Sequence, residues 1–251
     1  MTTPALIDGT GSPIGDYNSY CARGFWGKRE DDATVVAHQL ITFMSHITEL
    51  LDADEWLLCG RDDDGRLDEP YSDQQQVERW LNARILTDDS YPPRPIPSWG
   101  FVPHIRVIRD GQRIATIDGN VGAASGGNSL TEDCTSWLTR MDLDIACAHV
   151  RAIAACWSPT FADIKSIREI MAQRNGPKGL VTGRVMIGSV TYIAGLAAAD
   201  LASRMPGSVT LTDVHQGVLI VLGNGPLDYR YDDVAIVRDA VAEVRGDLRW
   251  E

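Results

Sequence analysis

Apolar residues recur every three or four positions in several segments, the spacing that places them on one face of an α-helix. This pattern predicts long helices at 35–51, 143–157 and 232–244 and weaker ones at 73–86 and 196–205. Acidic residues precede the first long helix and open the last one, where carboxylates interact favourably with the helix dipole. The periodicity therefore indicates amphipathic helices, each of which packs one apolar face against a core.

Shorter runs rich in β-branched and aromatic residues, bounded by glycine, proline or acidic turns, predict strands. These runs are 20–26, 56–59, 101–108, 113–117, 129–137, 184–193, 208–211 and 218–222, and 161–170 fits either strand or helix. Asp110-Gly111 between two apolar runs is a strong hairpin signal, and 213–217 is the turn of a second hairpin. The expected fold class is α+β, with a mixed, mostly antiparallel sheet or sheets flanked by helices.

The predicted domain organisation is a flexible arm at 1–17 followed by a single α+β domain at 18–251. The arm is predicted because glycine, proline, serine and threonine dominate it. The stretches 18–120 and 128–251 have a similar order of elements and are joined near the glycine-rich run 119–127. An internal duplication is one explanation and coincidence is the other, since no residue-level self-similarity decides between them.

Net charge narrows the range of partners. The 251 residues carry a formal charge of −12, whereas a nucleic-acid binder needs a basic face to contact phosphates. Direct binding of nucleic acid or of an anionic membrane is therefore disfavoured. No run of 18 apolar residues and no leader-like N-terminus occurs, and the five cysteines contain no C-x-x-C pair. These features favour a cytoplasmic, reducing location and a protein without disulfides or a zinc site. Cys147 and Cys156 are then expected to be buried as small hydrophobic residues.

Motifs for chemistry are weak throughout. The glycine-rich runs 122–127 and 223–226 lack the residues of a phosphate-binding loop, and the histidines lack the spacing of a metal-binding pair. Gly188-Ser189 lies in a predicted strand and not at a nucleophile elbow, and Cys134 could pair with a distant histidine only in the sense that any cysteine could. We therefore expect no enzyme activity, no catalytic residue, no cofactor and no metal. A hydrolase with an unrecognised Asp/His site is the alternative.

Acidic residues are concentrated in one part of the chain. Residues 52–73 contain nine acidic residues against two arginines, a net charge of −7. A solvated loop accounts for such a cluster, and a surface that attracts a basic partner accounts for it as well. The residues predicted to bind a partner are Asp62, Asp63, Asp64, Asp68 and Glu69, with Asp88 and Asp89 as outer support. Trp26 and Trp157 are predicted to lie in the core, because their large surfaces stabilise the fold most when buried.

Two segments contain structural motifs made of Trp, Gly, Tyr and apolar runs. The first is Gly24-Phe25-Trp26-Gly27-Lys28-Arg29-Glu30 before the long helix. The second is 188–244, which includes Thr191-Tyr192 and the run Val214-His215-Gln216-Gly217-Val218-Leu219-Ile220-Val221-Leu222. Together they cover about a third of the chain, and they resemble the immunity protein 52 family of bacterial polymorphic-toxin systems.

The resemblance implies a cytoplasmic antidote that binds a co-encoded toxin delivered by contact-dependent or type VI secretion. Toxins associated with this family are mainly nucleases, and a nuclease domain is usually basic because it grips phosphates. An acidic inhibitor would associate with it rapidly and block its active site. The expected partner is therefore a cognate toxin protein, with a monomeric inhibitor slightly favoured. A scaffold or homo-oligomer held by exposed aromatic residues is a third hypothesis.

Overall fold

The computed structural model describes residues 19–60, 68–134, 141–166, 169–170, 186–224 and 229–246. The predicted N-terminal arm at 1–17 lies outside these residues, as do 135–137 of one predicted strand and 225–226 of the second glycine-rich run. Every other element named above falls at least partly within them.

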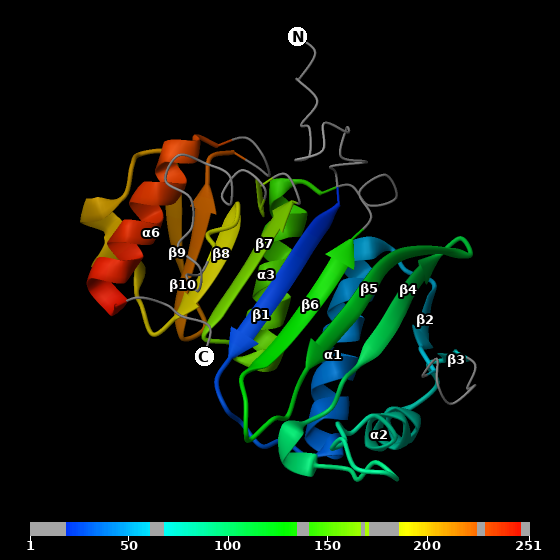
Figure 1. Cartoon of the computed structure of the whole chain (residues 1–251). Helices are drawn as coiled ribbons and strands as arrows, with labels where there is room; N and C mark the ends of the chain where they lie inside the picture. Colours follow the sequence, from blue (N-terminus) through cyan, green and yellow to red (C-terminus); the bar gives the residue numbers. More distant parts are fainter. Residues whose placement is uncertain are drawn as a thin grey trace, which may run out of the picture.

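Ten strands form one continuous sheet, and each pair of neighbouring strands is antiparallel (Figure 1). In chain order they are β1 (Tyr20–Trp26), β2 (Glu55–Leu58), β3 (Glu69–Pro70), β4 (His104–Arg109), β5 (Gln112–Asn120), β6 (Asn128–Cys134), β7 (Phe161–Ser166), β8 (Val190–Ala194), β9 (Val209–Val214) and β10 (Gly217–Leu222). Their spatial order is β3-β2-β4-β5-β6-β1-β7-β8-β10-β9. The first strand in the sequence is thus central in the sheet, between β6 and β7.

The helices are α1 (Ala33–Leu51), α2 (Gln74–Asn82), α3 (Leu143–Trp157), α5 (Ala198–Leu201) and α6 (Tyr231–Arg245), with short 3-10 turns η1 (Pro97–Trp99) and η2 (Ala202–Arg204). An aspartate caps the N-terminus of three helices: Asp32 for α1, Asp73 for α2 and Asp142 for α3. Each accepts a hydrogen bond from the backbone N–H of the third residue of its helix, which would otherwise be a free donor. The α+β class predicted from the sequence is confirmed.

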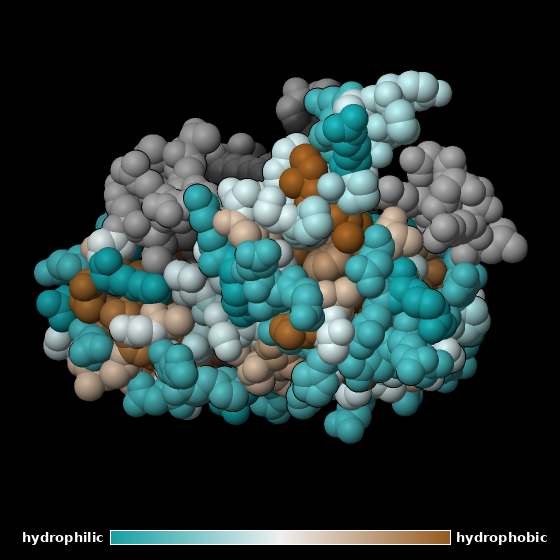
Figure 2. Space-filling model, turned by 90° about the horizontal axis from the view of Figure 1, so that it is seen from below, coloured by the Kyte–Doolittle hydropathy of each residue, from teal (hydrophilic) through white to brown (hydrophobic). Residues whose placement is uncertain are grey.

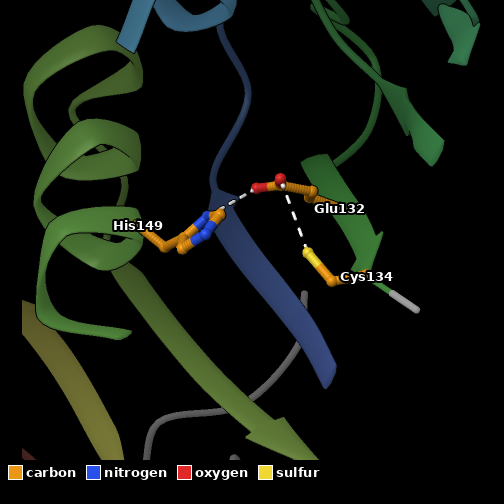
Figure 3. A group of neighbouring side chains, drawn as sticks. All are labelled: Glu132, Cys134 and His149. Atoms are coloured by element: carbon orange, nitrogen blue, oxygen red, sulfur yellow. Dashed lines mark hydrogen bonds and ion pairs between the residues drawn. The ribbon is translucent and has the colours of Figure 1, made fainter. Parts of the chain in front are cut away.

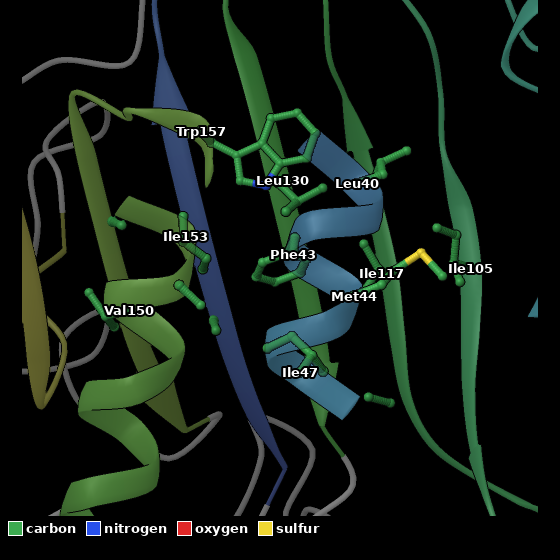
Figure 4. Packing of buried hydrophobic residues seen from close by; sticks show 14 of the residues in the cluster. Leu40, Phe43, Met44, Ile47, Ile105, Ile117, Leu130, Val150, Ile153 and Trp157 are labelled. Carbon is green, nitrogen blue, oxygen red and sulfur yellow. The ribbon is translucent and has the colours of Figure 1, made fainter. Parts of the chain in front are cut away.

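The helices cover the two faces of the sheet at different places. Helices α1 and α3 lie on one face, and their apolar side chains meet inward residues of β4, β5, β6 and β1 (Figure 4). Helix α6 lies on the opposite face, over β8 and β10, and forms a second, smaller core (Figure 1). Trp26 and Trp157 are buried and stacked with their ring centroids 5.4 Å apart, which confirms their predicted place in the core.

Some details differ from the sequence expectations, and one open alternative is resolved. The helix predicted at 73–86 ends at Asn82, because Ile85 forms a β-bridge with Phe101. The ambiguous run 161–170 forms strand β7 over its first six residues. Strand β8 begins at Val190, so Gly188-Ser189 precedes it, and Gly119 belongs to β5 and not to a loop.

The prediction that Cys147 and Cys156 are buried is wrong. Cys147 and Cys156 are only half-buried, since they lie beside the face of α3 that contacts the sheet. Cys21, Cys59 and Cys134, on or directly after strands, are the buried ones. All five thiols are free. The possible duplication of 18–120 and 128–251 stays a prediction.

Within the described residues, no helix combines the length and apolar character that crossing a membrane requires.

Candidate functional site

The structure describes four of the seven acidic residues predicted to bind a partner. Asp62, Asp63 and Asp64 lie outside the described residues. Asp68 is half-buried and accepts hydrogen bonds from the backbone N–H of Gly60, at 3.2 Å, and from Arg106 Nη1, at 2.5 Å. Glu69 is exposed on the edge strand β3 and accepts a 3.3 Å hydrogen bond from Gln76. The carboxylate of Asp68 is therefore held by internal hydrogen bonds, whereas Glu69 faces solvent.

Asp88 and Asp89 belong to a loop between α2 and β4, residues 86–99, here called the 86–99 loop. Asp88 Oδ1 accepts hydrogen bonds from the backbone N–H groups of Ser90 (3.1 Å) and Arg94 (2.9 Å), and from the Ser90 hydroxyl. These bonds lower the pKa of Asp88 from its ordinary value, with the Ser90 hydroxyl as the largest cause. Asp88 thus fixes the tip of the loop, and its neighbour Asp89 is exposed.

Backbone hydrogen bonds hold the rest of the 86–99 loop in a narrow hairpin. Asp88 N–H donates to the Arg94 carbonyl at 3.0 Å, and Ile96 N–H donates to the Leu86 carbonyl at 2.8 Å. At the base of the loop, Phe101 pairs with both Ile85 and Val121. Both ends of the loop are therefore anchored to the sheet, and hydrogen bonds to Asp88 hold its tip together.

The tip of this loop presents Tyr91, whose side chain is 100% exposed. Trp99, in η1 at the end of the loop, is 41% exposed, and Val35 in the first turn of α1 is 42% exposed. Single exposed apolar side chains are common on folded proteins, and an aromatic one on an ordered loop is a candidate anchor for a partner. These three residues account for all but one of the exposed large hydrophobic side chains in the described parts of the chain; the fourth is Ile236 on α6.

Three loops meet at this end of the molecule. The Ser98 carbonyl accepts hydrogen bonds from the backbone N–H groups of Ala124 (2.9 Å) and Ser125 (3.0 Å), and the Ala123 carbonyl accepts one from Arg29 N–H (2.9 Å). The 86–99 loop, the turn at 121–127 and the connection from β1 to α1 are thus contiguous. Figure 2 views this end and shows a mainly hydrophilic surface in which apolar patches are small and separate.

A second group of polar residues lies inside the protein, between β6 and α3. Glu132, Cys134 and His149 are 0%, 2% and 0% exposed, and one potential ligand atom of each lies within 4.8 Å of the others (Figure 3). Glu132 Oε2 is 2.9 Å from His149 Nδ1, and the Cys134 thiol is 3.6 Å from Glu132 Oε1. No local spacing in the sequence relates 132 and 134 to 149, so the contact between these residues was not predicted.

Cys134 does not have the features of a nucleophile in this arrangement. Burial raises the pKa of its thiol well above the ordinary value, and the nearby Glu132 raises it further. A catalytic cysteine needs a lowered pKa and access to substrate, and its base should contact the sulfur. Here the thiol contacts a carboxylate, while His149 contacts the other oxygen of that carboxylate. The hydrolase alternative gains no support from this group and stays an untested prediction.

The opposite face of the sheet also contains buried charges. Asp163 and Lys165, both 0% exposed on β7, form an ion pair, and Arg23 Nε lies 3.9 Å from Asp163 Oδ1. Lys165 also donates to the Met186 carbonyl at 3.3 Å. The carboxylate of Asp163 is thus neutralised by protein cations, which is the usual condition for burying a charge.

An open groove of about 490 Å3 lies between α3 and the β9–β10 hairpin. Thr210, Thr212 and Leu219 contribute from the strands, and Asp144 and Arg151 contribute from the helix. The lining is mixed, with one acidic and one basic side chain two helical turns apart. It offers no paired acid and base of the kind that hydrolysis requires among the described residues.

Comparisons with known proteins identify the fold and no family. No protein-family model matches the chain, and no curated protein matches it. Among solved structures, the chain is similar to one named Pseudomonas aeruginosa T6SS protein PA0821, with a TM-score of 0.55 and 14% sequence identity. The similarity covers 93% of this chain and 78% of that one. At this identity the comparison shows a shared fold, and it neither shows nor excludes the immunity protein 52 family.

Proposed function

We propose that this protein is an immunity protein that binds a cognate secreted toxin and neutralises it by occlusion, with the 86–99 loop at the centre of the interface. The observation that carries the proposal is the fully exposed Tyr91 on a loop that Asp88 holds in one conformation. Tyrosine and tryptophan supply much of the binding energy in protein interfaces. A loop that is already ordered also loses less conformational entropy on binding.

The surroundings of the loop favour a protein partner over a permanent second copy of the chain. Obligate interfaces are large and apolar, of the order of 2,000 Å2 or more. The face of the molecule seen in Figure 2 is mainly hydrophilic, and its apolar patches are small. Two aromatic anchors within a polar surface are instead typical of a complex between two independently folded proteins.

Charge supports a basic partner. The chain carries −12 overall, and the 86–99 loop and the β1–α1 connection expose the acidic Asp89, Glu30 and Asp32 together with the basic Lys28 and Arg94. A toxin that cleaves nucleic acid presents a basic cleft to phosphates. An acidic inhibitor would be steered to that cleft and would compete with the substrate for it. The proposed toxin is therefore a nuclease, encountered in the cytoplasm.

The type VI secretion context comes from two independent lines. The segments 24–30 and 188–244 resemble an immunity family of polymorphic-toxin systems, and a distant structural neighbour is named as a T6SS protein. Each supports the class of function and leaves the identity of the toxin open.

Co-expression tests the proposal. The C-terminal domain of the toxin encoded beside this gene is induced in a bacterial host with and without the full chain. We expect the host to survive only with the chain, and the two purified proteins to elute together as a 1:1 complex. Killing that persists while the chain is present at excess, as measured by immunoblot, would refute the proposed function.

A further inference from the structure

Glu132, Cys134 and His149 are three good metal ligands that converge in the dry interior (Figure 3). Glu132 and Cys134 are two residues apart on β6 and therefore point to the same face of the sheet, toward α3. His149 reaches them from the sheet-facing side of α3. The group thus connects the two layers of the main core at one point.

The geometry is close to that of a zinc site. Zinc bonds of about 2.3 Å to sulfur and about 2.1 Å to nitrogen or oxygen place tetrahedral donor atoms roughly 3.4–3.6 Å apart. The observed separations are 3.6 Å between Cys134 Sγ and Glu132 Oε1, and 2.9 Å between Glu132 Oε2 and His149 Nδ1. All three donor atoms lie within 4.8 Å of one another, so shifts of an ångström or less would complete the arrangement.

The buried carboxylates on the two faces of the sheet have different basic neighbours. On the other face of the sheet, the buried Asp163 is neutralised by Lys165 and Arg23. Among the described residues, Glu132 has His149 as its one basic neighbour, and His149 Nε2 has no hydrogen-bond partner there. An ion at Nδ1 would bond to both Nδ1 and Glu132 in place of their present contact, whereas Nε2 would keep its present surroundings.

We propose that Glu132, Cys134 and His149 bind one Zn²⁺ ion that fastens α3 to β6. A thiolate, a carboxylate and a neutral imidazole carry −2 together, so a divalent ion makes the buried group neutral. Binding replaces the thiol proton of Cys134 with a sulfur–zinc bond and releases that proton to solvent. Thiolate and imidazole donors select zinc over the hard cations calcium and magnesium.

The role of this ion is structural, and it does not depend on the proposed function. Three ligands from two elements link β6 to α3 near the centre of the sheet, beside Ala22 of β1. Ala22, which lies opposite Glu132 on β1, is fully buried and small. The ion would therefore stabilise the layer contact and leave the surface of the protein unchanged.

Metal binding by the purified full chain tests the proposal. The chain is stripped with a chelator and titrated with ZnCl2 by calorimetry, and separately with Co²⁺, which gives a strong thiolate-to-metal absorption band when cysteine binds it. We expect one ion per chain, a Co²⁺–thiolate band, and a thermal midpoint that rises with zinc. Glu132→Gln should weaken zinc binding at least about tenfold, because ligands and their supporting contacts contribute on this scale.

Cys134→Ser is the decisive variant, and Cys156→Ser is its matched control, since Cys156 is a half-buried thiol on the same helix as His149. Cys134→Ser should abolish the Co²⁺–thiolate band and the zinc-induced rise in the thermal midpoint, whereas Cys156→Ser should keep both. The comparison uses the rise with zinc, so a variant that is less stable on its own still gives an answer. Wild-type protein that binds no zinc, or Cys134→Ser that binds it as wild type does, would overturn the proposal.

Discussion

Tyr91→Ala separates binding from folding, because the Tyr91 side chain is 100% exposed at the tip of the 86–99 loop. Asp88, and not Tyr91, holds the loop together through its hydrogen bonds to Ser90 and Arg94. The variant should therefore unfold at the same temperature as wild type. Its affinity for the toxin domain should fall sharply, since Tyr91 supplies the largest unburied aromatic surface on the described part of the molecule.

The size of the loss follows from the area available. A tyrosine buries roughly 150 Å2 or more in a contact, and each Å2 of apolar area contributes about 25 cal/mol. Complete burial corresponds to a factor of about 500 in affinity, and burial of half the side chain to a factor of about 25. We expect a loss between these limits, with most of it in the dissociation rate.

Surface plasmon resonance on the immobilised toxin domain measures both rates, and differential scanning calorimetry measures the stability of each variant. Ile236→Ala is the matched control, because Ile236 is an exposed hydrophobic residue on α6, which covers the other face of the sheet. It should bind as wild type does. If Tyr91→Ala changes affinity less than threefold, or if Ile236→Ala weakens binding more than Tyr91→Ala does, the assignment of the loop to the interface is wrong.

Three further predictions concern the fold. Trp157→Ala should lower the free energy of unfolding by about 3–5 kcal/mol in chemical denaturation. Trp157→Phe should lower it by less than half of that, because Phe keeps much of the stack on Trp26. Equal losses for the two variants would contradict this packing. Gly217→Ala should cost about 1–3 kcal/mol, since an added Cβ would lie 2.2 Å from the Ile193 carbonyl oxygen, whereas Gly126→Ala has open space and should be neutral. The hydrogen bond from His104 to Asp118 raises the pKa of His104 from 6.5 to about 9, so its stabilising effect is complete below 6.5 and disappears as the pH rises through about 9. His104→Gln should therefore be less stable than wild type at pH 6 and equal to it above pH 10, as measured by urea denaturation; a difference that does not change with pH would exclude this linkage.

Local periodicity in the sequence was sufficient to predict the long helices and both hairpins. Leu40, Phe43 and Ile47 follow a helical spacing, and all three are buried against the sheet. Trp26 and Trp157 could be assigned to the core from size alone. The order of strands was not predictable, because nothing near β1 in the sequence specifies that it pairs with β6 and β7.

The candidate sites depended on the same long-range information. A glutamate at 132, between the inward-facing Leu130 and Cys134, was a local signal for a buried acid, and His149 falls on the apolar face of its helix. Their meeting required the packing of α3 on β6. Likewise, the conformation of the loop that exposes Tyr91 depends on hydrogen bonds of Asp88 that spacing does not reveal.

The described acidic residues that were predicted to bind a partner differ in their internal contacts. Asp68 and Asp88 satisfy internal donors, so their charges support the fold, whereas Glu69 and Asp89 face solvent. A charged residue that is already paired contributes less to steering a partner than one that is free. Neutralising Asp89 should therefore affect association more than neutralising Asp68.

Hydrogen–deuterium exchange on the complex with the toxin domain tests the central claim most directly. Amides of the 86–99 loop, the 121–127 turn and the β1–α1 connection form one contiguous surface, so binding there should slow their exchange together. Peptides from α6 should exchange at the same rate with and without the toxin. Protection confined to α6 or to the β9 edge, with the 86–99 loop unchanged, would contradict the account.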